Sequence, residues 1–191
     1  MTREAFIEEL NAKSYSYEIV GDKLVVTHNG YVDLRSLKSL PSGVVFNNRH
    51  YVNLKSLVTL PSGVEFRNGA YVNLYTLNSI PSDVVFDNGG YINLESLNSL
   101  PSGVVFRNEG AVYLNSLETL NSGVEFNNEG NIYLRSLKTL PSGVVFRNEG
   151  DVLLVSLMGG WFSECGGIIN GISNKPLLNS MIKRGIFKSI I

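Results

Sequence analysis

The chain has 191 residues, of which 16 are Lys or Arg and 17 are Asp or Glu, so its net charge at pH 7 is −1. A charge this close to zero provides no overall basic field, which disfavours binding to nucleic-acid phosphates or anionic lipid through net charge alone. The single cysteine, Cys165, has no intrachain partner for a disulfide, as is typical of proteins in a reducing cytoplasm.

The N-terminal segment, MTREAFIEEL, lacks a basic stretch followed by an apolar one. Nowhere in the chain do about 18 apolar residues follow one another, as a membrane-spanning helix requires. We therefore expect neither a signal peptide nor a membrane span, and we expect a cytoplasmic location.

Residues 1–30 predict a helix followed by a β-hairpin. Thr2 can act as the N-cap of a helix over Arg3–Ala12, which would carry Phe6 and Leu10 on one face. The next stretch places apolar residues on both sides of a tight Gly21–Asp22 turn, as in a hairpin. We interpret this segment as an N-terminal cap, because an uncovered end of a repeat array exposes apolar surface and unpaired strand edges.

A twenty-residue unit recurs without insertion from about Tyr31 to Asp151, and its copy at Tyr91–Gly110 reads YINLESLNSLPSGVVFRNEG. A fixed period of this size is the signature of a solenoid, in which each unit buries its apolar face only by stacking on its neighbours. The sequence of each unit predicts two short strands, one around Val-x-Leu and one at Val-x-Phe. Between them, leucines at steps of three and a Pro-Ser-Gly segment predict a bend. We therefore predict a mainly β fold, a parallel β-solenoid over residues 31–158.

An asparagine follows the second strand in every unit. Asparagine at a turn can bond backbone groups that no strand pairing reaches, and stacked copies can also bond one another. We interpret this column as a structural asparagine ladder, whose members are Asn48, Asn68, Asn88, Asn108, Asn128 and Asn148.

The pattern Val-x-Leu-x-x-Leu-x-x-Leu-Pro-Ser-Gly-Val-x-Phe-x-Asn, which covers about two thirds of the chain, resembles short bacterial leucine-rich repeats. It departs from the common LxxLxLxxNxL form because Leu stands where that form has Asn, which leaves both a curved horseshoe and a flatter β-solenoid open. The helix-hairpin start and the tail from Gly166 to Phe187 are also similar to uncharacterised leucine-rich-repeat proteins of bacteria and their phages.

The period ends after Leu157, where Gly159 and Gly160 begin a segment of different composition. An apolar stripe that includes Leu177 and Ile182 predicts a helix, so we interpret residues 159–191 as a C-terminal helical cap. This segment is locally basic and carries apolar residues near its end, which suggests a homodimer contact or a contact with an anionic partner. The candidate dimer contacts are Ile186, Phe187 and Ile190.

The first strand of each unit should point its variable residues outward, because alternate side chains face opposite sides of a strand. Tyrosine dominates these positions and supplies a large contact area with little loss of rotamer freedom, which is typical of protein-binding faces. The other interpretation is that stacked tyrosines only stabilise neighbouring strands. The candidate partner-binding residues are Tyr31, Tyr51, Tyr71, Tyr75, Tyr91, Tyr113, Tyr133, Arg35, Lys55 and Arg135.

Glu109, Glu129 and Glu149 form an acidic column at one turn of the units. Stacking brings these like charges close together, although Arg107 and Arg147 can offset their repulsion. We interpret the column as a solvated edge, with a metal site or a docking site for a basic partner as the alternatives.

The sequence carries no phosphate-binding loop, no dinucleotide fingerprint and no cluster with metal-ligand spacing. His28 and His50 fall at turns, and Cys165 lacks a neighbouring base or cation, so structural roles account for all three. We expect a protein that is not an enzyme and that needs no cofactor.

The leading hypothesis is a non-enzymatic protein-binding repeat module. The resemblance to phage proteins implies an anti-CRISPR-like inhibitor that occludes the surface of a host defence protein in the host cytoplasm. One alternative is a single-stranded nucleic-acid binder that stacks bases on the tyrosines, although this face has too little positive charge to favour it. The other alternative is a structural or self-assembling protein.

Overall fold

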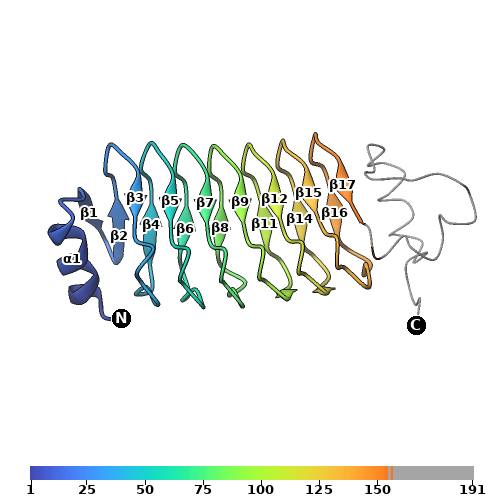
Figure 1. Cartoon of the computed structure of the whole chain (residues 1–191), viewed down its shortest axis with the longest axis horizontal. Helices are drawn as coiled ribbons and strands as arrows, with labels where there is room; N and C mark the ends of the chain where they lie inside the picture. The colour runs from blue at the N-terminus through green and yellow to red at the C-terminus, as the bar shows by residue number, and fades with distance from the viewer. Residues whose placement is uncertain (155, 157–191) are drawn as a thin grey trace, which may run out of the picture.

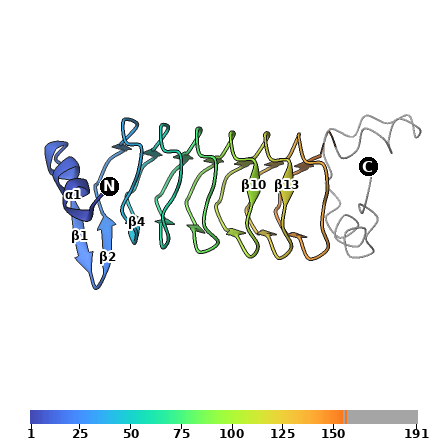
Figure 2. The same cartoon turned by 90° about the horizontal axis from the view of Figure 1, so that it is seen from below.

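The computed structural model describes residues 1–154 and residue 156, which form a rod of stacked coils (Figure 1). Successive coils lie side by side in a nearly straight row, and the perpendicular view shows the same row (Figure 2). The protein is therefore a parallel β-solenoid, and the flatter of the two predicted shapes is the one observed. The predicted C-terminal cap, residues 159–191, lies outside the described residues, together with Cys165 and the predicted dimer contacts Ile186, Phe187 and Ile190.

The helix of the N-terminal end, α1 (Arg3–Ala12), begins and ends where the sequence predicts. Thr2 caps it, because the Thr2 hydroxyl accepts a hydrogen bond of 3.2 Å from the backbone N–H of Ala5. Phe6 and Leu10 are fully buried and belong to the core of the solenoid. The helix thus covers apolar surface at the N-terminal end, as a cap requires.

The predicted hairpin is present as β1 (Tyr17–Val20) and β2 (Lys23–Val26), which pair antiparallel across the Gly21–Asp22 turn. Strand β2 also pairs in parallel with β4, with Leu24 opposite Val44 and therefore twenty residues from it. The second strand of the hairpin is thus already a strand of the solenoid, and β1 runs against it at the end of the sheet.

The first strands of the units form a seven-stranded parallel sheet, which we call the front sheet, in the order β17-β15-β12-β9-β7-β5-β3. Each of its pairs joins residues that are twenty positions apart, such as Val72 and Ile92. Its strands are β3 (Val32–Asp33), β5 (Val52–Asn53), β7 (Val72–Asn73), β9 (Ile92–Asn93), β12 (Val112–Tyr113), β15 (Ile132–Tyr133) and β17 (Val152–Leu153).

The second strands form an eight-stranded sheet, which we call the back sheet, in the order β1-β2-β4-β6-β8-β11-β14-β16. A further pair, β10 (Ser99–Leu100) with β13 (Thr119–Leu120), lies where the sequence predicts only a bend (Figure 2). The remaining strands of the back sheet are β4 (Val44–Phe46), β6 (Glu65–Phe66), β8 (Val85–Phe86), β11 (Val105–Phe106), β14 (Glu125–Phe126) and β16 (Val145–Phe146).

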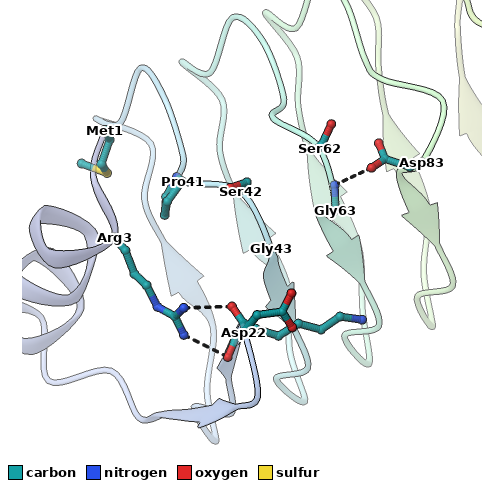
Figure 3. Close-up of a pocket in the computed structure, with 10 residues that line it drawn as sticks. Met1, Arg3, Asp22, Pro41, Ser42, Gly43, Ser62, Gly63 and Asp83 are labelled. Atoms are coloured by element: carbon teal, nitrogen blue, oxygen red, sulfur yellow. Dashed lines mark hydrogen bonds between the residues drawn. The ribbon is translucent and has the colours of Figure 1, made fainter.

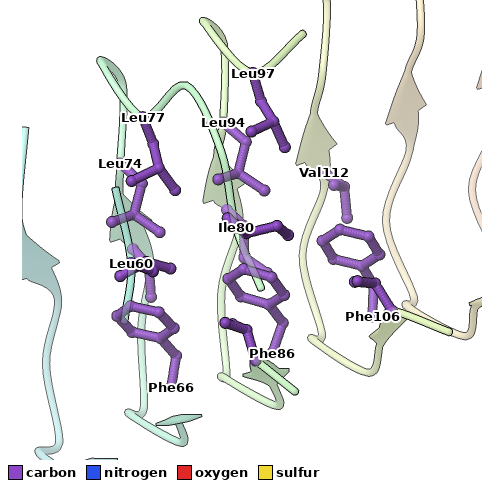
Figure 4. Packing of buried hydrophobic residues seen from close by; sticks show 14 of the residues in the cluster. Leu60, Phe66, Leu74, Leu77, Ile80, Phe86, Leu94, Leu97, Phe106 and Val112 are labelled. Carbon is purple, nitrogen blue, oxygen red and sulfur yellow. The ribbon is translucent and has the colours of Figure 1, made fainter. Parts of the chain in front are cut away.

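The core contains the predicted apolar columns together with Phe6, Leu10, Leu24 and Val26 of the N-terminal segment, and no member of it is more than 8% exposed. The phenylalanines of the back sheet stack in a continuous row, with neighbouring ring centroids 5.0–5.6 Å apart and planes within 7°. Figure 4 shows leucines and phenylalanines of successive coils aligned inside the rod. The columns begin at Val32, Leu34, Leu37, Leu40, Val44 and Phe46 and recur every twenty residues.

The asparagine column is buried, but its hydrogen bonds differ in part from those predicted. The Asn68 amide nitrogen donates to the carbonyl oxygen of Ala70 at 2.8 Å and to that of His50, in the preceding unit, at 3.2 Å. The side-chain oxygen of each of these asparagines has no hydrogen-bond partner within the described structure, so the predicted bonds between asparagine side chains are absent. The column joins successive units through the backbone instead.

Leu94→Ala is expected to lower the free energy of unfolding by roughly 2–5 kcal/mol, because this leucine is fully buried and its neighbours can fill the cavity only in part. Urea unfolding followed by circular dichroism measures the change. Val58→Ala, at an exposed valine, is the control and should change stability by less than about 0.5 kcal/mol. Equal losses in the two variants would contradict this description of the core.

Candidate protein-binding face

The outer surface of the front sheet carries the candidate residues. Alternation along each two-residue strand buries the first residue and directs the second toward solvent, as at Val72 and Asn73. The flanking tyrosines also face outward, with Tyr31 55% exposed, Tyr75 43% and Tyr91 38%. The outward placement predicted from the sequence therefore agrees with the observed burial.

Four tyrosines form a stack along the rod, because their positions recur every twenty residues and the strands pair in that register. Ring centroids lie 5.2 Å apart for Tyr31 and Tyr51, 4.6 Å for Tyr51 and Tyr71, and 4.7 Å for Tyr71 and Tyr91, with planes within 11°. Burial raises the pKa of the Tyr71 hydroxyl, and its two tyrosine neighbours raise it further. The inner rings of the stack have another ring against each face and present their edges to solvent.

The stack changes column at the next unit, where Ala111 occupies the position of the tyrosines. Tyr113, two residues on, takes over and stacks on Tyr133 with centroids 4.7 Å apart. Tyr91 meets Tyr113 edge to face, at 5.7 Å and 88°. The six tyrosines therefore make one continuous row with a step in it, which we call the tyrosine row.

The three cationic side chains predicted for this face all contact it. Arg35 Nε donates to both carboxylate oxygens of Asp33, at 2.8 and 3.0 Å, and this hydrogen bonding holds the pKa of Asp33 below its ordinary value. Lys55 lies over the ring of Tyr75 at 5.8 Å, and Arg135 lies over the ring of Tyr133 at 6.0 Å. These cations are therefore engaged with neighbouring groups of the same face.

A shallow hollow of about 420 Å³ lies at the step in the tyrosine row. Its lining consists of Tyr75, Tyr91, Asn93, Glu95 and Tyr113. The Asn115 amide nitrogen donates to both carboxylate oxygens of Glu95, at 2.9 and 3.1 Å.

Alternation already places Glu95, with Tyr91 and Asn93, in the outward strip where the units differ, but the sequence did not predict that these residues line a hollow together with Tyr75 and Tyr113. Two breaks in the repeat fall in adjacent units and could have indicated the hollow. Glu95 places a charge in the column that holds Tyr75 one unit earlier, and Ala111 interrupts the tyrosine column one unit later.

The acidic column lies on the edge of the rod. Glu109, Glu129 and Glu149 are exposed, and the backbone N–H of Glu109 donates to the carbonyl of Asn88 in the preceding unit. Arg147, predicted to offset these charges, donates to the Glu125 carboxylate at 2.8 Å. Within residues 1–154 and 156, no group of three His, Cys, Asp or Glu side chains is placed to hold a metal ion.

The two histidines lie near the N-terminal end of the rod. The His28 ring is half-buried and packs against the ring of Tyr15 with centroids 4.8 Å apart, whereas His50 is exposed at a corner. The His50 carbonyl accepts hydrogen bonds from the side chains of Asn48 and Asn68. Both residues thus have structural contacts at the corners of the coils.

A second hollow, of about 530 Å³, lies where α1 meets the first coils (Figure 3). Arg3 donates to the carbonyl oxygens of Asp22 at 2.8 Å and Lys23 at 3.2 Å, and so joins the helix to the hairpin. The backbone N–H of Gly63 donates to the Asp83 carboxylate at 2.9 Å. The Arg3 bonds thus hold the helix against the hairpin, and the Gly63–Asp83 bond joins two successive coils.

The back sheet carries an ion-pair cluster on its outer surface. Glu65 is buried, with only 9% of the residue exposed. Its carboxylate accepts hydrogen bonds from Lys23 at 2.5 Å and from Arg67 at 2.7 Å. Burial by itself would raise the pKa of Glu65, but the hydrogen bonds from these two cations outweigh it and hold the pKa below its ordinary value. The cluster joins β2 to β6 across two coils.

No protein-family model matches the chain, and neither a curated protein nor a solved structure matches it. In the described part of the chain no helix is both long and apolar enough to cross a membrane. The class that the fold and the face define is a parallel β-solenoid of twenty-residue units with a stepped row of outward-facing tyrosines.

The stability that Glu65 contributes is expected to depend on pH. Because its pKa is lowered in the folded protein, this contribution is present above the unfolded-state pKa of about 4.3 and is lost as the pH falls through the folded value. Glu65→Gln should therefore be less stable than wild type by about 1 kcal/mol at pH 7, and the difference should shrink below about pH 4.

Urea unfolding at a series of pH values measures both effects. Glu118→Gln, which removes the exposed partner of Lys138, is the matched control and should show a smaller difference at pH 7. A difference between wild type and Glu65→Gln that stays constant down to pH 3 would contradict this account.

Proposed function

We propose that the protein is a non-enzymatic binding module whose front sheet binds another protein through the tyrosine row. The observation that carries this proposal is the continuity of the row, from Tyr31 to Tyr133, across the exposed surface. A tyrosine side chain offers a large amphipathic contact area and loses little rotamer entropy on binding. Stacking on a rigid solenoid already restricts the side-chain rotamers in the free protein, so less entropy remains to be lost when a partner binds.

Stabilisation of the coils alone explains the tyrosine row less well. The buried phenylalanines already form an aromatic stack through the back sheet from β4 to β16. On the front sheet, the column occupied by Tyr91 continues as Ala111, and the row moves to Tyr113. A purely stabilising stack gains nothing from this change of column, whereas a change of surface shape is what a specific partner requires.

The geometry of the face argues against the binding of single-stranded nucleic acid. Base stacking needs open ring faces, and the inner rings of the row are covered on both faces by their neighbours. Arg35, Lys55 and Arg135 are engaged with groups of the same face, which leaves few cations for a phosphate backbone.

For the setting, we retain the leucine-rich-repeat resemblance and propose an inhibitor of a host defence protein that acts by surface occlusion in the host cytoplasm. The support is the similarity of the two ends of the chain to phage and bacterial repeat proteins. A homodimer through Ile186, Phe187 and Ile190 is a further part of this proposal, and it rests on the apolar and basic composition of the tail.

A double variant, Tyr71→Ala with Tyr91→Ala, is expected to weaken binding of the protein partner at least tenfold, because it removes two central rings of the row. Partners are captured from cells of the host on the immobilised wild-type protein, and the affinity of each is then measured with purified components.

Arg107→Ala, at an exposed position directly after β11 of the back sheet, is the control and should bind as wild type does. Circular dichroism checks that the double variant is folded. A folded double variant that binds every partner with wild-type affinity would refute the role of the tyrosine row.

A further inference from the structure

The hollow at the step of the tyrosine row combines aromatic rings with a carboxylate. Tyr75, Tyr91 and Tyr113 come from three successive coils and line the hollow together with Asn93, at the end of β9, and Glu95, two residues further on. Asn115 holds the Glu95 carboxylate through its amide nitrogen, and the backbone N–H of Glu95 donates to Asn93 Oδ1 at 3.2 Å. These contacts fix the position of the negative charge before any ligand arrives.

In the part of the chain that the structure describes, Glu95 has no cationic partner. Within residues 1–154 and 156, no Lys or Arg forms an ion pair with it, and its hydrogen-bond donor is a neutral amide. A carboxylate has about four acceptor sites, so the Asn115 amide leaves it able to accept further hydrogen bonds. The hollow therefore offers unused acceptor capacity and an unneutralised charge.

The same face already holds cations against its tyrosines. Lys55 lies over Tyr75 at the N-terminal side of the hollow, and Arg135 lies over Tyr133 at its other side. Both contacts are cation–π interactions, in which the negative face of the ring attracts the positive charge. The hollow lies between these two cations. Tyr75 in its lining already has Lys55 over its ring, whereas Tyr91, Tyr113 and the Glu95 carboxylate have no cation against them in the described structure.

We propose that this hollow binds an ammonium or guanidinium group, supplied by a lysine or arginine side chain of the protein that the tyrosine row binds. The carboxylate of Glu95 pairs with the charge, and Tyr75, Tyr91 and Tyr113 contact the cation and the aliphatic part of the side chain. The same carboxylate repels phosphate and other anions. The claim that a protein partner supplies the cation rests on the proposed function above. The claim that the hollow binds such a cation does not.

The chemistry is tested with a free probe and the full-length protein. Nα-acetyl-lysine methylamide is titrated into protein labelled on its tyrosine rings and backbone amides, and nuclear magnetic resonance reports the shifts. Changes confined to Tyr75, Tyr91, Tyr113 and their neighbours are expected, with a dissociation constant on the order of millimolar. The neutral isostere, Nα-acetyl-norleucine methylamide, should produce no such changes.

Glu95→Gln should weaken probe binding at least tenfold, and Glu118→Gln, at an exposed carboxylate elsewhere on the rod, should leave it unchanged. The variant is expected to fold, because Glu95 is only half-buried and glutamine has nearly the same shape as glutamate. The backbone amide spectrum of the variant checks this. Equal shifts with the norleucine probe, or full lysine binding by Glu95→Gln, would overturn the proposal.

The protein partner distinguishes the source of the cation. Glu95→Gln should weaken binding of the partner at least tenfold if the partner supplies the side chain. If Tyr71→Ala with Tyr91→Ala loses the partner but Glu95→Gln keeps full affinity, the inference about the hollow fails and the proposed function stands. If the lysine probe binds but the wild-type protein captures no protein, the proposed function fails. The claim that a protein partner supplies the cation then fails as well.

Discussion

Everything in this molecule depends on parallel pairing between coils in an unbroken twenty-residue register. The strands are too short to exist alone, since most have two residues and are held by bonds such as that from the N–H of Val72 to the carbonyl of Tyr91 at 3.0 Å. A slip of one residue would turn the apolar columns toward solvent and the polar positions into the core. The same register produces the phenylalanine stack, the asparagine column and the tyrosine row.

Most of the fold could be predicted from the sequence, because period and alternation together decide which residues face inward. Val32 and Leu34 are buried as expected, and Thr2 caps α1. The membership of β2 in the back sheet was not predicted, because Lys23–Val26 lacks the Leu-Pro that precedes the equivalent strand of later units. The predicted bonds from the asparagines to the backbone are present, as at Asn68. The predicted bonds between asparagine side chains are absent, because the amide nitrogens reach backbone carbonyls whose positions a column of identical residues does not reveal.

The candidate face was predictable only in outline. Alternation places Tyr71 outside, but the hollow lies where the repeat is broken: Glu95 lines it, and Ala111 interrupts the tyrosine column one unit later. The positions that repeat build the rod, and the positions that vary shape its surface. Because the two sets lie on opposite sides of each strand, the surface can change from coil to coil without disturbing the core. This separation lets a rigid repeat carry a local, asymmetric site.

The hairpin at the N-terminal end reverses the chain direction within one sheet, since β1 runs antiparallel to β2 while β2 runs parallel to β4. Every other neighbour in the back sheet is parallel. A second molecule that approached this end in the coil-on-coil register would meet a strand of the wrong polarity, and α1 occupies the space beside it. A second molecule therefore cannot extend the rod at this end by stacking its coils in the same way. The N-terminal coil stays the first of the array, and each residue of the front sheet keeps a fixed distance from that end.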